Sequence, residues 1–497
     1  MPSRLTFYRR IAALVLVCAS AFIARVKATG DEVDFLLKFA ESEHAEAVSP
    51  ELMGFNIVYC NERDAAWDGG RGKVPQLLAE LNTRILRYPG GTVDTFYHWK
   101  EPTGQGWVDS WSEEYNPAKN LPASATMSLD EYLDLVKRRG LAPLIGINLS
   151  SGLRFPARHS AAVAEAEGLV RHCLARGVSG GYYYLDNEHY RPDANFNSSP
   201  EVYGEEFITY ARMIRSLDPN ARLIANLHSG ANENGRDWVR RVIRRAGAWI
   251  DLVDLHFYWR HNNTSFLAWT QDAHMTHQRG GSYREQRVYY REMFAREGFP
   301  DIDVVSLEWN ISASGKNPQP TQSEAALMVS EQFIQFIQSG MRIACFWPLS
   351  MPGNYKWQYR CVFNSGREYA PNKVFGMFRL FAEIGGQIPM ASRVVAGSDG
   401  EWLTHLVLHS PDRRTVTLFL VNKNQRLGTS SIAVELPANR PGCEVRAVGF
   451  EASDDSGEVL HVHPIPVSRM GDRASWSMPK NSFAKVVISP MSMEGRQ

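Results

Sequence analysis

The 497-residue sequence predicts an α/β protein, a (β/α)8 TIM barrel followed by a C-terminal antiparallel β-sandwich. Eight short apolar runs, each closed by polar residues, recur between residues 51 and 386. Amphipathic helical segments separate these runs, and after about Gly386 the pattern changes to short alternating runs divided by turn residues. Apolar strands that alternate with amphipathic helices are typical of a parallel sheet covered by helices, and eight such units close into a barrel.

The eight predicted strands begin at regular intervals along the barrel region. In chain order they are MGFNIVYC from Met53, TRILRYPG from Thr83, APLIGINLS from Ala142, GYYYLDNE from Gly181, RLIANLHS from Arg222, LVDLHFYW from Leu252, DVVSLEWN from Asp303 and IACFWPLS from Ile343. The run GYYYLDNE is apolar and aromatic until it ends on an acidic and amide cluster. Such an ending suits a strand whose tip opens into a catalytic pocket.

The clearest predicted helix is SLDEYLDLVKRRG, in which apolar residues recur at i, i+3, i+4 and i+7. Ser128 and Glu131 have the spacing of a capping box, and Gly140 is placed to end the helix. The other clear helical segments are SPEVYGEEFITYARMIRSL, GRDWVRRVIRRAG, SEAALMVSEQFIQFIQSG and NKVFGMFRLFAEIGG.

The predicted barrel, residues 51–386, is flanked by three other segments. Residues 1–28 have a basic start, an apolar run from Ile11 to Ala24 and a small-residue exit, which predicts a signal peptide and therefore a secreted or periplasmic protein. Segment 29–50 fits an extra strand of the sandwich or a short amphipathic helix equally well. Residues 387–497 form the predicted sandwich.

Charge and cysteine content restrict the partners. Lys plus Arg and Asp plus Glu both total 54, so no net field would attract nucleic acid, or a membrane after signal cleavage, and a neutral partner is expected. The cysteines beyond the predicted signal peptide are odd in number and widely spaced, unlike a disulfide framework. No CxxC pair and no HxxxH pair on a predicted helix supplies metal-ligand spacing, so no metal and no cofactor are expected.

Chemistry in such a barrel sits at the carboxyl ends of the strands, so the polar residues that close the runs should meet in one bowl. Glu188 after the fourth strand and Glu308 after the seventh are the candidate catalytic residues. The candidate substrate-binding residues are Arg87, Asn148, Asn187, His228, His256, Tyr258 and Trp347 at the strand tips, with Asp94, His98 and Tyr190 in the loops beyond them.

Two carboxylates facing each other across a pocket are what the cleavage of a glycosidic bond requires. At about 5–5.5 Å between carboxyl groups, one can attack the anomeric carbon while the other protonates the leaving oxygen and later activates water. We expect Arg87 and Tyr258 to keep Glu308 charged, and an aromatic wall that includes Tyr190 to raise the pKa of Glu188. Trp347 would offer an apolar face to a sugar ring.

Four motifs carry a family resemblance: LRYPGGT with YHWK on the second strand, LDNE on the fourth, LHFY on the sixth and SLEWN on the seventh. Together they resemble retaining glycoside hydrolases of clan A, and most of all α-L-arabinofuranosidases. The resemblance covers the barrel and the sandwich. It implies an oligosaccharide or polysaccharide substrate.

By this resemblance Glu188 is the acid/base, Glu308 is the nucleophile and Asn187 hydrogen-bonds the sugar 2-hydroxyl. The sequence departs from the family pattern at Asp186, where the arabinofuranosidases usually carry Gly, and at Leu307, where they carry Asp. The LDNE form is also similar to some endoglucanases of the clan, and the RYPGGT turn resembles agarase-like hydrolases. These departures leave the substrate open.

Each assignment has a structural alternative. Glu188 could satisfy a free N–H group at a helix start, Arg87 could pair with a structural carboxylate, His256 and Tyr258 could be core residues, and Trp347 could plug the barrel end. The pairing of two glutamates three strands apart favours the catalytic interpretation.

The leading hypothesis is a secreted retaining glycosidase acting on a neutral plant or algal polysaccharide, with arabinofuranoside cleavage as its first candidate reaction. An endo-acting hydrolase of the same clan, agarase-, glucanase- or xylanase-like, is the second hypothesis. A non-catalytic carbohydrate-binding protein is the third. The oligomeric state stays open.

Overall fold

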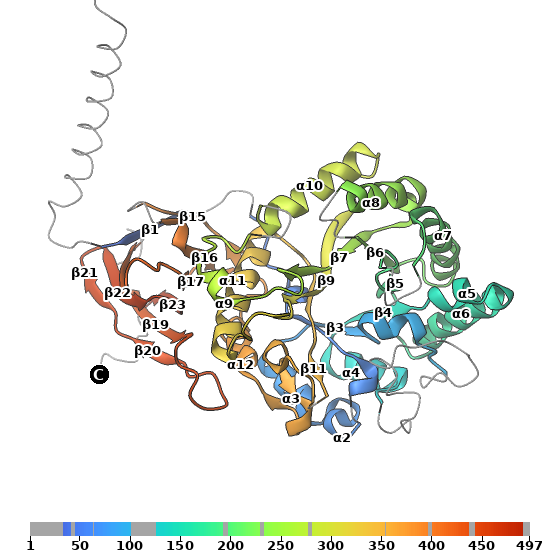
Figure 1. The fold of residues 1–497 in the computed structure, drawn as a ribbon, viewed down its shortest axis with the longest axis horizontal. Helices are drawn as coiled ribbons and strands as arrows, with labels where there is room; N and C mark the ends of the chain where they lie inside the picture. Colours follow the sequence, from blue (N-terminus) through green and yellow to red (C-terminus); the bar gives the residue numbers. More distant parts are fainter. Residues whose placement is uncertain are drawn as a thin grey trace, which may run out of the picture.

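The computed structural model describes residues 33–40, 45–62, 64–100, 126–191, 197–228, 233–276, 281–352, 354–395, 400–436 and 443–490. A barrel with helices around it lies beside a β-sandwich (Figure 1). The segment predicted as a signal peptide, residues 1–28, lies outside the described residues.

Eight parallel strands close the barrel in the order β2–β3–β4–β5–β6–β7–β9–β10, with β10 pairing back onto β2. This confirms the predicted fold class. The strands are β2 (Gly54–Asn56), β3 (Ile85–Tyr88), β4 (Ala142–Ile147), β5 (Tyr182–Leu185), β6 (Arg222–Leu227), β7 (Leu252–Leu255), β9 (Asp303–Ile311) and β10 (Ala344–Phe346), with the short β8 (Phe257–Trp259) also pairing with β9.

Strand β9 carries one extra residue relative to both of its neighbours. From Val305 to Trp309 it advances four positions, whereas the facing chain advances three, from Asp254 to Phe257. The register between β9 and β10 shifts by one as well. An inserted residue of this kind is a β-bulge, which interrupts the ladder and re-aims side chains. The single strand predicted for LVDLHFYW is therefore two strands, β7 and β8.

The helices around the barrel are α2 (Asp64–Trp67), α3 (Lys73–Glu80), α4 (Leu129–Arg139), α5 (Ser150–Arg154), α6 (His159–Ala175), α7 (Pro200–Leu217), α8 (Glu233–Ala246), α9 (Phe266–Thr270), α10 (Tyr283–Arg296), α11 (Gln322–Ser339) and α12 (Lys373–Leu380). The capping box predicted from Ser128 and Glu131 is present in α4, and Gly140 ends that helix at φ 61°. Among the described residues, none of the helices combines the length and apolarity that crossing a bilayer needs.

The sandwich consists of two sheets. The first has the order β15–β1–β18–β22–β21 and the second β14–β16–β17–β23–β19–β20. The strands are β1 (Phe35–Ala40), β14 (Ile388–Pro389), β15 (Ala391–Val394), β16 (Leu403–His409), β17 (Val416–Asn422), β18 (Thr429–Glu435), β19 (Cys443–Glu451), β20 (His463–Ile465), β21 (Ser468–Met470), β22 (Arg473–Pro479) and β23 (Ser482–Pro490). A further small sheet contains β11 (Ser350–Met351), β12 (Phe363–Asn364) and β13 (Ala370–Pro371).

The segment before the barrel contributes strand β1 to the first sheet, where it runs antiparallel to β15 but parallel to β18. That sheet is therefore mixed, whereas the sequence predicts only antiparallel pairing. The sequence predicts sandwich strands at EWLTHLVLHS, RRTVTLFLVNKN, SSIAVELP, CEVRAVGF, VLHVHPIPV and SFAKVVISP, and strand β22 is not among them. The alternating pattern of RASWSMP is hard to recognise because small polar residues fill its other face.

The sandwich packs directly against the barrel helices. Phe381, just after α12, stacks on Phe419 of β17 with ring centroids 4.3 Å apart. Deeper in this interface the Lys423 ammonium meets the Glu331 carboxylate of α11 at 2.8 Å, and both side chains are fully buried. Separating this ion pair would leave a buried charge without its partner, so the pair favours one relative arrangement of the barrel and the sandwich. In Figure 1, α11 and α12 lie between the red sandwich strands and the barrel.

Candidate active site

The run of tyrosines in β5 alternates between two environments, as a strand requires. Tyr183 packs in the core between sheet and helices, whereas Tyr184 points into the barrel with Ile85, Leu144 and other inward residues. The Tyr184 ring lies under the Arg87 guanidinium, 4.3 Å from its centroid. The aromatic run thus supplies the floor of the site as well as part of the outer core.

Beyond β5 the backbone turns sharply and presents its polar residues. Asp186 and Glu188 adopt φ values of 65° and 52°, a left-handed conformation that non-glycine residues seldom take. The Asp186 carboxylate accepts hydrogen bonds from the backbone N–H groups of Leu149, Ser150 and Asn187, at 2.6–2.8 Å. These bonds offset the strain and tie the turn to the start of α5. Glycine adopts this left-handed conformation without strain, so the Gly of the family pattern is compatible with the backbone of this turn.

The β-bulge in β9 places Leu307 and Glu308 on the inner side together. Leu307 fills the barrel interior, while Glu308 next to it faces the pocket. At the bulge, side chains replace the strand-to-strand hydrogen bonds of the Leu307 backbone. The Leu307 N–H donates to the Asp254 carboxylate at 2.6 Å, and the Leu307 carbonyl accepts from Asn56 Nδ2 at 2.6 Å. Leu307 therefore has a packing role at the second departure from the family pattern.

Arg87 of β3 connects the two acidic tips. Its Nη1 donates to Glu308 Oε1 at 2.7 Å, and its Nη2 donates to Asn187 Oδ1 at 2.7 Å. Tyr258 of β8 donates its hydroxyl to the other Glu308 oxygen at 2.9 Å. Because Arg87 is fully buried, this charge-assisted contact holds the Glu308 carboxylate in one orientation.

Three donors converge on the carboxylate of Glu188. Tyr190 donates its hydroxyl to Oε1 at 2.8 Å, and His256 Nδ1 lies 2.8 Å from the same oxygen. Arg191 donates from Nη1 to Oε2 at 2.8 Å. Behind them, the Glu188 backbone N–H bonds to Asn226 Oδ1 at 2.5 Å, which fixes the turn to β6.

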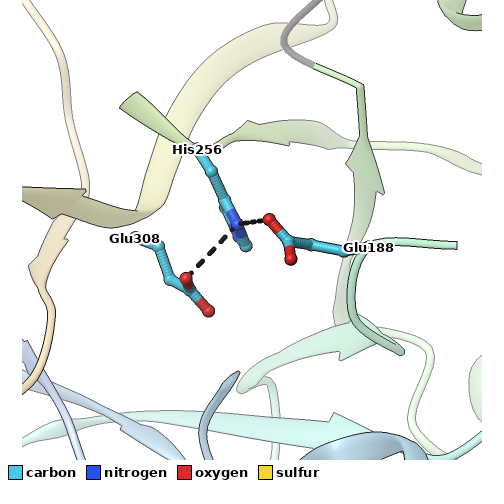
Figure 2. A group of neighbouring side chains, drawn as sticks. All are labelled: Glu188, His256 and Glu308. Atoms are coloured by element: carbon cyan, nitrogen blue, oxygen red, sulfur yellow. Dashed lines mark hydrogen bonds and ion pairs between the residues drawn. The ribbon is translucent and has the colours of Figure 1, made fainter. Parts of the chain in front are cut away.

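His256 stands between the two glutamates. Its Nδ1 is 2.8 Å from Glu188 Oε1 and 3.4 Å from Glu308 Oε2, as Figure 2 shows. One atom from each of the three residues lies within 4.8 Å of the others. On its other side, His256 Nε2 faces Asp254 Oδ2 at 3.1 Å. The two carboxylates therefore face each other across a single narrow gap.

The electrostatics of Glu188 differ from the expectation. Burial raises its pKa, but the charge and hydrogen bond of His256, followed by those of Arg191, outweigh burial and hold the pKa of Glu188 below its usual range. Burial lowers the pKa of His256, yet Glu308, Asp254 and Glu188 outweigh it and raise the pKa to about 10. The prediction of a raised pKa was wrong because it counted the aromatic wall, left out the charge of His256 and missed Arg191.

The triad of Glu188, His256 and Glu308 is compact enough to surround an ion. Three cationic groups oppose that use: the guanidiniums of Arg87 and Arg191, and His256 itself, with its raised pKa. Because a metal ion would have to displace a proton from the imidazole and sit among these charges, we assign no metal role to the triad.

The turn after β3 lies next to Glu308. Gly90 and Gly91 have φ values of 92° and 60°. A Cβ atom on Gly91 would lie 3.2 Å from Trp347 Nε1 and 3.6 Å from Glu308 Oε1. Trp347 follows β10 and is half-buried, so part of its indole stays accessible beside the pocket. The RYPGGT turn thus brings backbone close to the acidic group where a side chain would crowd it.

Gly90 gives a sharp test of this turn. We expect Gly90→Ala to destabilise the fold by about 4 kcal/mol or more, because the new Cβ would lie 1.6 Å from the Ile57 carbonyl oxygen. Gly140→Ala is the matched control: its φ is also positive, but nothing lies within 4 Å, so about 1 kcal/mol is expected from the left-handed backbone alone. Urea unfolding of both variants measures the difference, and equal losses would contradict the close approach at Gly90.

Four other predicted residues lie at or behind the strand tips without touching either glutamate carboxylate through a described hydrogen bond. His98 is almost fully buried and pairs with Glu165 of α6 at 2.9 Å. Asn148 bonds to the Tyr97 carbonyl and to Ser151. The other two are Asp94, fully buried beside Gly146, and His228, whose ring packs against Tyr190 with centroids 4.5 Å apart.

Sequence reasoning missed three residues of the site. Asp254 supports both His256 and the bulge, Arg191 holds Glu188, and Arg360 places its guanidinium 5.5 Å from the ring centroids of both Tyr258 and Trp347. Asp254 is an acidic residue within an apolar strand, which is a signal that could have found it. Arg360 lies in an irregular segment and Arg191 in a loop, where no periodicity marks them.

No protein-family model matches the chain. Among curated proteins, an intracellular exo-α-(1→5)-L-arabinofuranosidase of Streptomyces lividans is 26% identical over 214 residues, 40% of this chain and 32% of the relative. An enzyme of the same description from Bacillus subtilis is 26% identical over 232 residues, 42% of this chain and 44% of the relative. The chain thus spans less than half the length of these curated relatives.

Solved structures extend the likeness to the whole fold. A family 51 α-L-arabinofuranosidase from Bifidobacterium longum superposes with a TM-score of 0.67 at 16% identity, covering 92% of this chain and 100% of that one. An α-L-arabinofuranosidase from Thermotoga maritima, in its arabinose complex, has a TM-score of 0.67 at 14% identity with the same coverage. At these identities the likeness shows a shared fold.

The comparisons overturn the predicted localisation. The first five curated relatives are named intracellular enzymes, so the prediction of a secreted or periplasmic protein is wrong on this comparison. The prediction rested on a basic start followed by an apolar run, and such a compositional pattern does not by itself determine the compartment. In sequence and in fold, the chain is similar to the α-L-arabinofuranosidases of clan A, as its motifs indicated.

Proposed function

We propose that this chain is a retaining glycoside hydrolase that cleaves terminal α-L-arabinofuranosyl units by double displacement. Glu308 is the nucleophile and Glu188 the acid/base. The observation that carries the proposal is the pair of carboxylates at the carboxyl end of the barrel, with an oxygen of Glu188 and an oxygen of Glu308 within 4.8 Å of each other. Retaining enzymes need about 5–5.5 Å between carboxyl groups, whereas inverting enzymes leave about 6.5–9.5 Å for a water.

The surroundings of each carboxylate suit these two roles. Glu308 is held by Arg87 and Tyr258, one on each carboxylate oxygen, so its orientation is fixed at the gap. Glu188 is held at Oε1 by Tyr190 and His256, both at 2.8 Å. Oε2 is then the oxygen that carries the proton for leaving-group departure, and Glu188 later takes a proton from water.

The remaining site residues are proposed to bind sugar. Asn187, oriented by Arg87, is placed to bond the 2-hydroxyl, and the half-buried Trp347 offers its accessible face to the ring. The similar proteins named as arabinofuranosidases support a five-membered sugar. The equal numbers of acidic and basic residues support a neutral plant or algal polysaccharide as the source of that sugar.

A panel of 4-nitrophenyl glycosides, with arabinan, arabinoxylan, agarose and β-glucan, tests the proposal. We expect release of 4-nitrophenol from the α-L-arabinofuranoside and of free arabinose from arabinan. Products of several sugar units from agarose or β-glucan would instead identify an endo-acting hydrolase. Absence of hydrolysis on the entire panel would refute glycosidase activity and favour the carbohydrate-binding hypothesis.

A further inference from the structure

The guanidinium of Arg191 covers the second oxygen of Glu188, Oε2. Tyr190 and His256 both contact Oε1 of Glu188. This oxygen therefore already has two hydrogen-bond partners. Figure 2 shows the other oxygen, Oε2, pointing away from the His256 ring. Arg191 donates to Oε2 at 2.8 Å. An acid that protonates a glycosidic oxygen must offer it an O–H, and Oε2 is the oxygen left for that task.

The contact between Arg191 and Glu188 Oε2 lies partly in solvent. The Arg191 side chain is 36% exposed, whereas that of Glu188 is 10% exposed. Solvent screens the exposed side of this ion pair, so a bound sugar can displace the guanidinium of Arg191 more readily than a fully buried one. The other cations of the site are held differently, because Arg87 is fully buried between Glu308 and Asn187.

From this geometry we infer that Arg191 is a positioning residue that covers Glu188 Oε2 in the free protein and gives way when a leaving-group sugar binds. The inference rests on the proposed function. Departure of the guanidinium removes a positive charge from beside the carboxylate, which favours the protonated acid at the moment when it is needed. Arg191 thereby couples acid strength to occupancy of the leaving-group side of the pocket, and its freed N–H groups can bond the hydroxyls of that sugar.

Several other charged and titratable groups face Glu188. The charged and titratable groups that face it are Arg191 and Tyr190 from its own loop, His256 and Asp254 from the end of β7, and, beyond these, Glu308 of β9, Arg87 of β3 and Tyr258 of β8. Of the cations among them, only Arg191 can be replaced without touching Glu308 or its partners.

The test is the pH profile of kcat/KM for Arg191→Gln. An alkyl arabinofuranoside, whose poor leaving group needs the acid, should show its alkaline limb displaced upward by about one pH unit, because carboxylates beside an arginine titrate about 1–3 units low. The 2,4-dinitrophenyl arabinofuranoside needs little proton donation and should show a smaller displacement. Arg191→Lys keeps the charge and should restore the alkaline limb toward that of the wild type.

Arg241→Gln is the matched control, because it removes a guanidinium from an exposed pair with Glu201 on the outer helices α7 and α8. Its profile should match the wild type. An alkaline limb of Arg191→Gln that stays in place, moves downward or moves equally for both substrates would overturn the inference. If wild-type protein hydrolyses neither substrate, the proposed function itself fails, which is a distinct result.

Discussion

Replacing Glu308 with glutamine is expected to lower kcat on 4-nitrophenyl α-L-arabinofuranoside by roughly 10⁴-fold or more. The amide cannot attack the anomeric carbon, so the covalent route is lost. Glutamine keeps the size of the side chain, and its amide oxygen can still accept from Arg87, which holds this position at 2.7 Å in the wild type. Its NH2 group then faces the Tyr258 hydroxyl, which can turn to accept. The fold should therefore survive, and circular dichroism with a thermal melt checks it.

Tyr258→Phe is the control for Glu308. It removes one hydrogen bond to the carboxylate and leaves the nucleophile in place. A loss of roughly ten- to a hundred-fold is expected, since a hydrogen bond to a charged group is worth about 1.5–3 kcal/mol. If Glu308→Gln retained activity comparable to that of Tyr258→Phe, Glu308 would not be the nucleophile.

Replacing Glu188 with alanine is the second large effect. Removal of a general acid/base costs about 10²–10⁴-fold, and the loss should grow as the leaving group becomes poorer. With 2,4-dinitrophenyl arabinofuranoside the first step needs no acid, so the glycosyl-enzyme forms and then waits for an activated water. Azide needs no general base, and its addition should restore turnover and yield the arabinofuranosyl azide.

The variant His256→Asn distinguishes the role of Glu188 as acid/base from the role of the neighbouring His256. This variant loses the contacts with Glu188 at 2.8 Å and Glu308 at 3.4 Å but keeps both carboxylates. Azide should not rescue it, because Glu188 is still present to activate water. Azide rescue of His256→Asn but not of Glu188→Ala would reverse the assignment of the base.

Most of the fold could be predicted from periodicity because apolar runs and helical faces are local signals. The capping box of α4 is a case in which four residues determine a helix start. The split of the sixth strand could not be predicted, since it results from an extra residue in β9, which is distant in sequence. The mixed sheet of the sandwich depends on β1 pairing with β18 almost 400 residues away.

The same distinction applies to the candidate site. The rule that catalytic residues follow the barrel strands predicted Glu188, Glu308, Arg87 and His256 as one site. In the structure Arg87 contacts Glu308, and His256 contacts both glutamates. The electrostatics could not be predicted from residue types. Whether Glu188 is surrounded by aromatic rings or by cations depends on side-chain directions, and Arg191 comes from a loop that carries no pattern.

The stereochemistry of transfer to methanol tests the central claim most directly. Wild-type protein acting on 4-nitrophenyl α-L-arabinofuranoside in dilute methanol should produce methyl α-L-arabinofuranoside, identified by the anomeric signals in its NMR spectrum, because two displacements across the Glu188–Glu308 gap restore the original configuration. Formation of the β-anomer, or of inverted free sugar with no methyl glycoside, would contradict the double displacement and the roles given to both carboxylates.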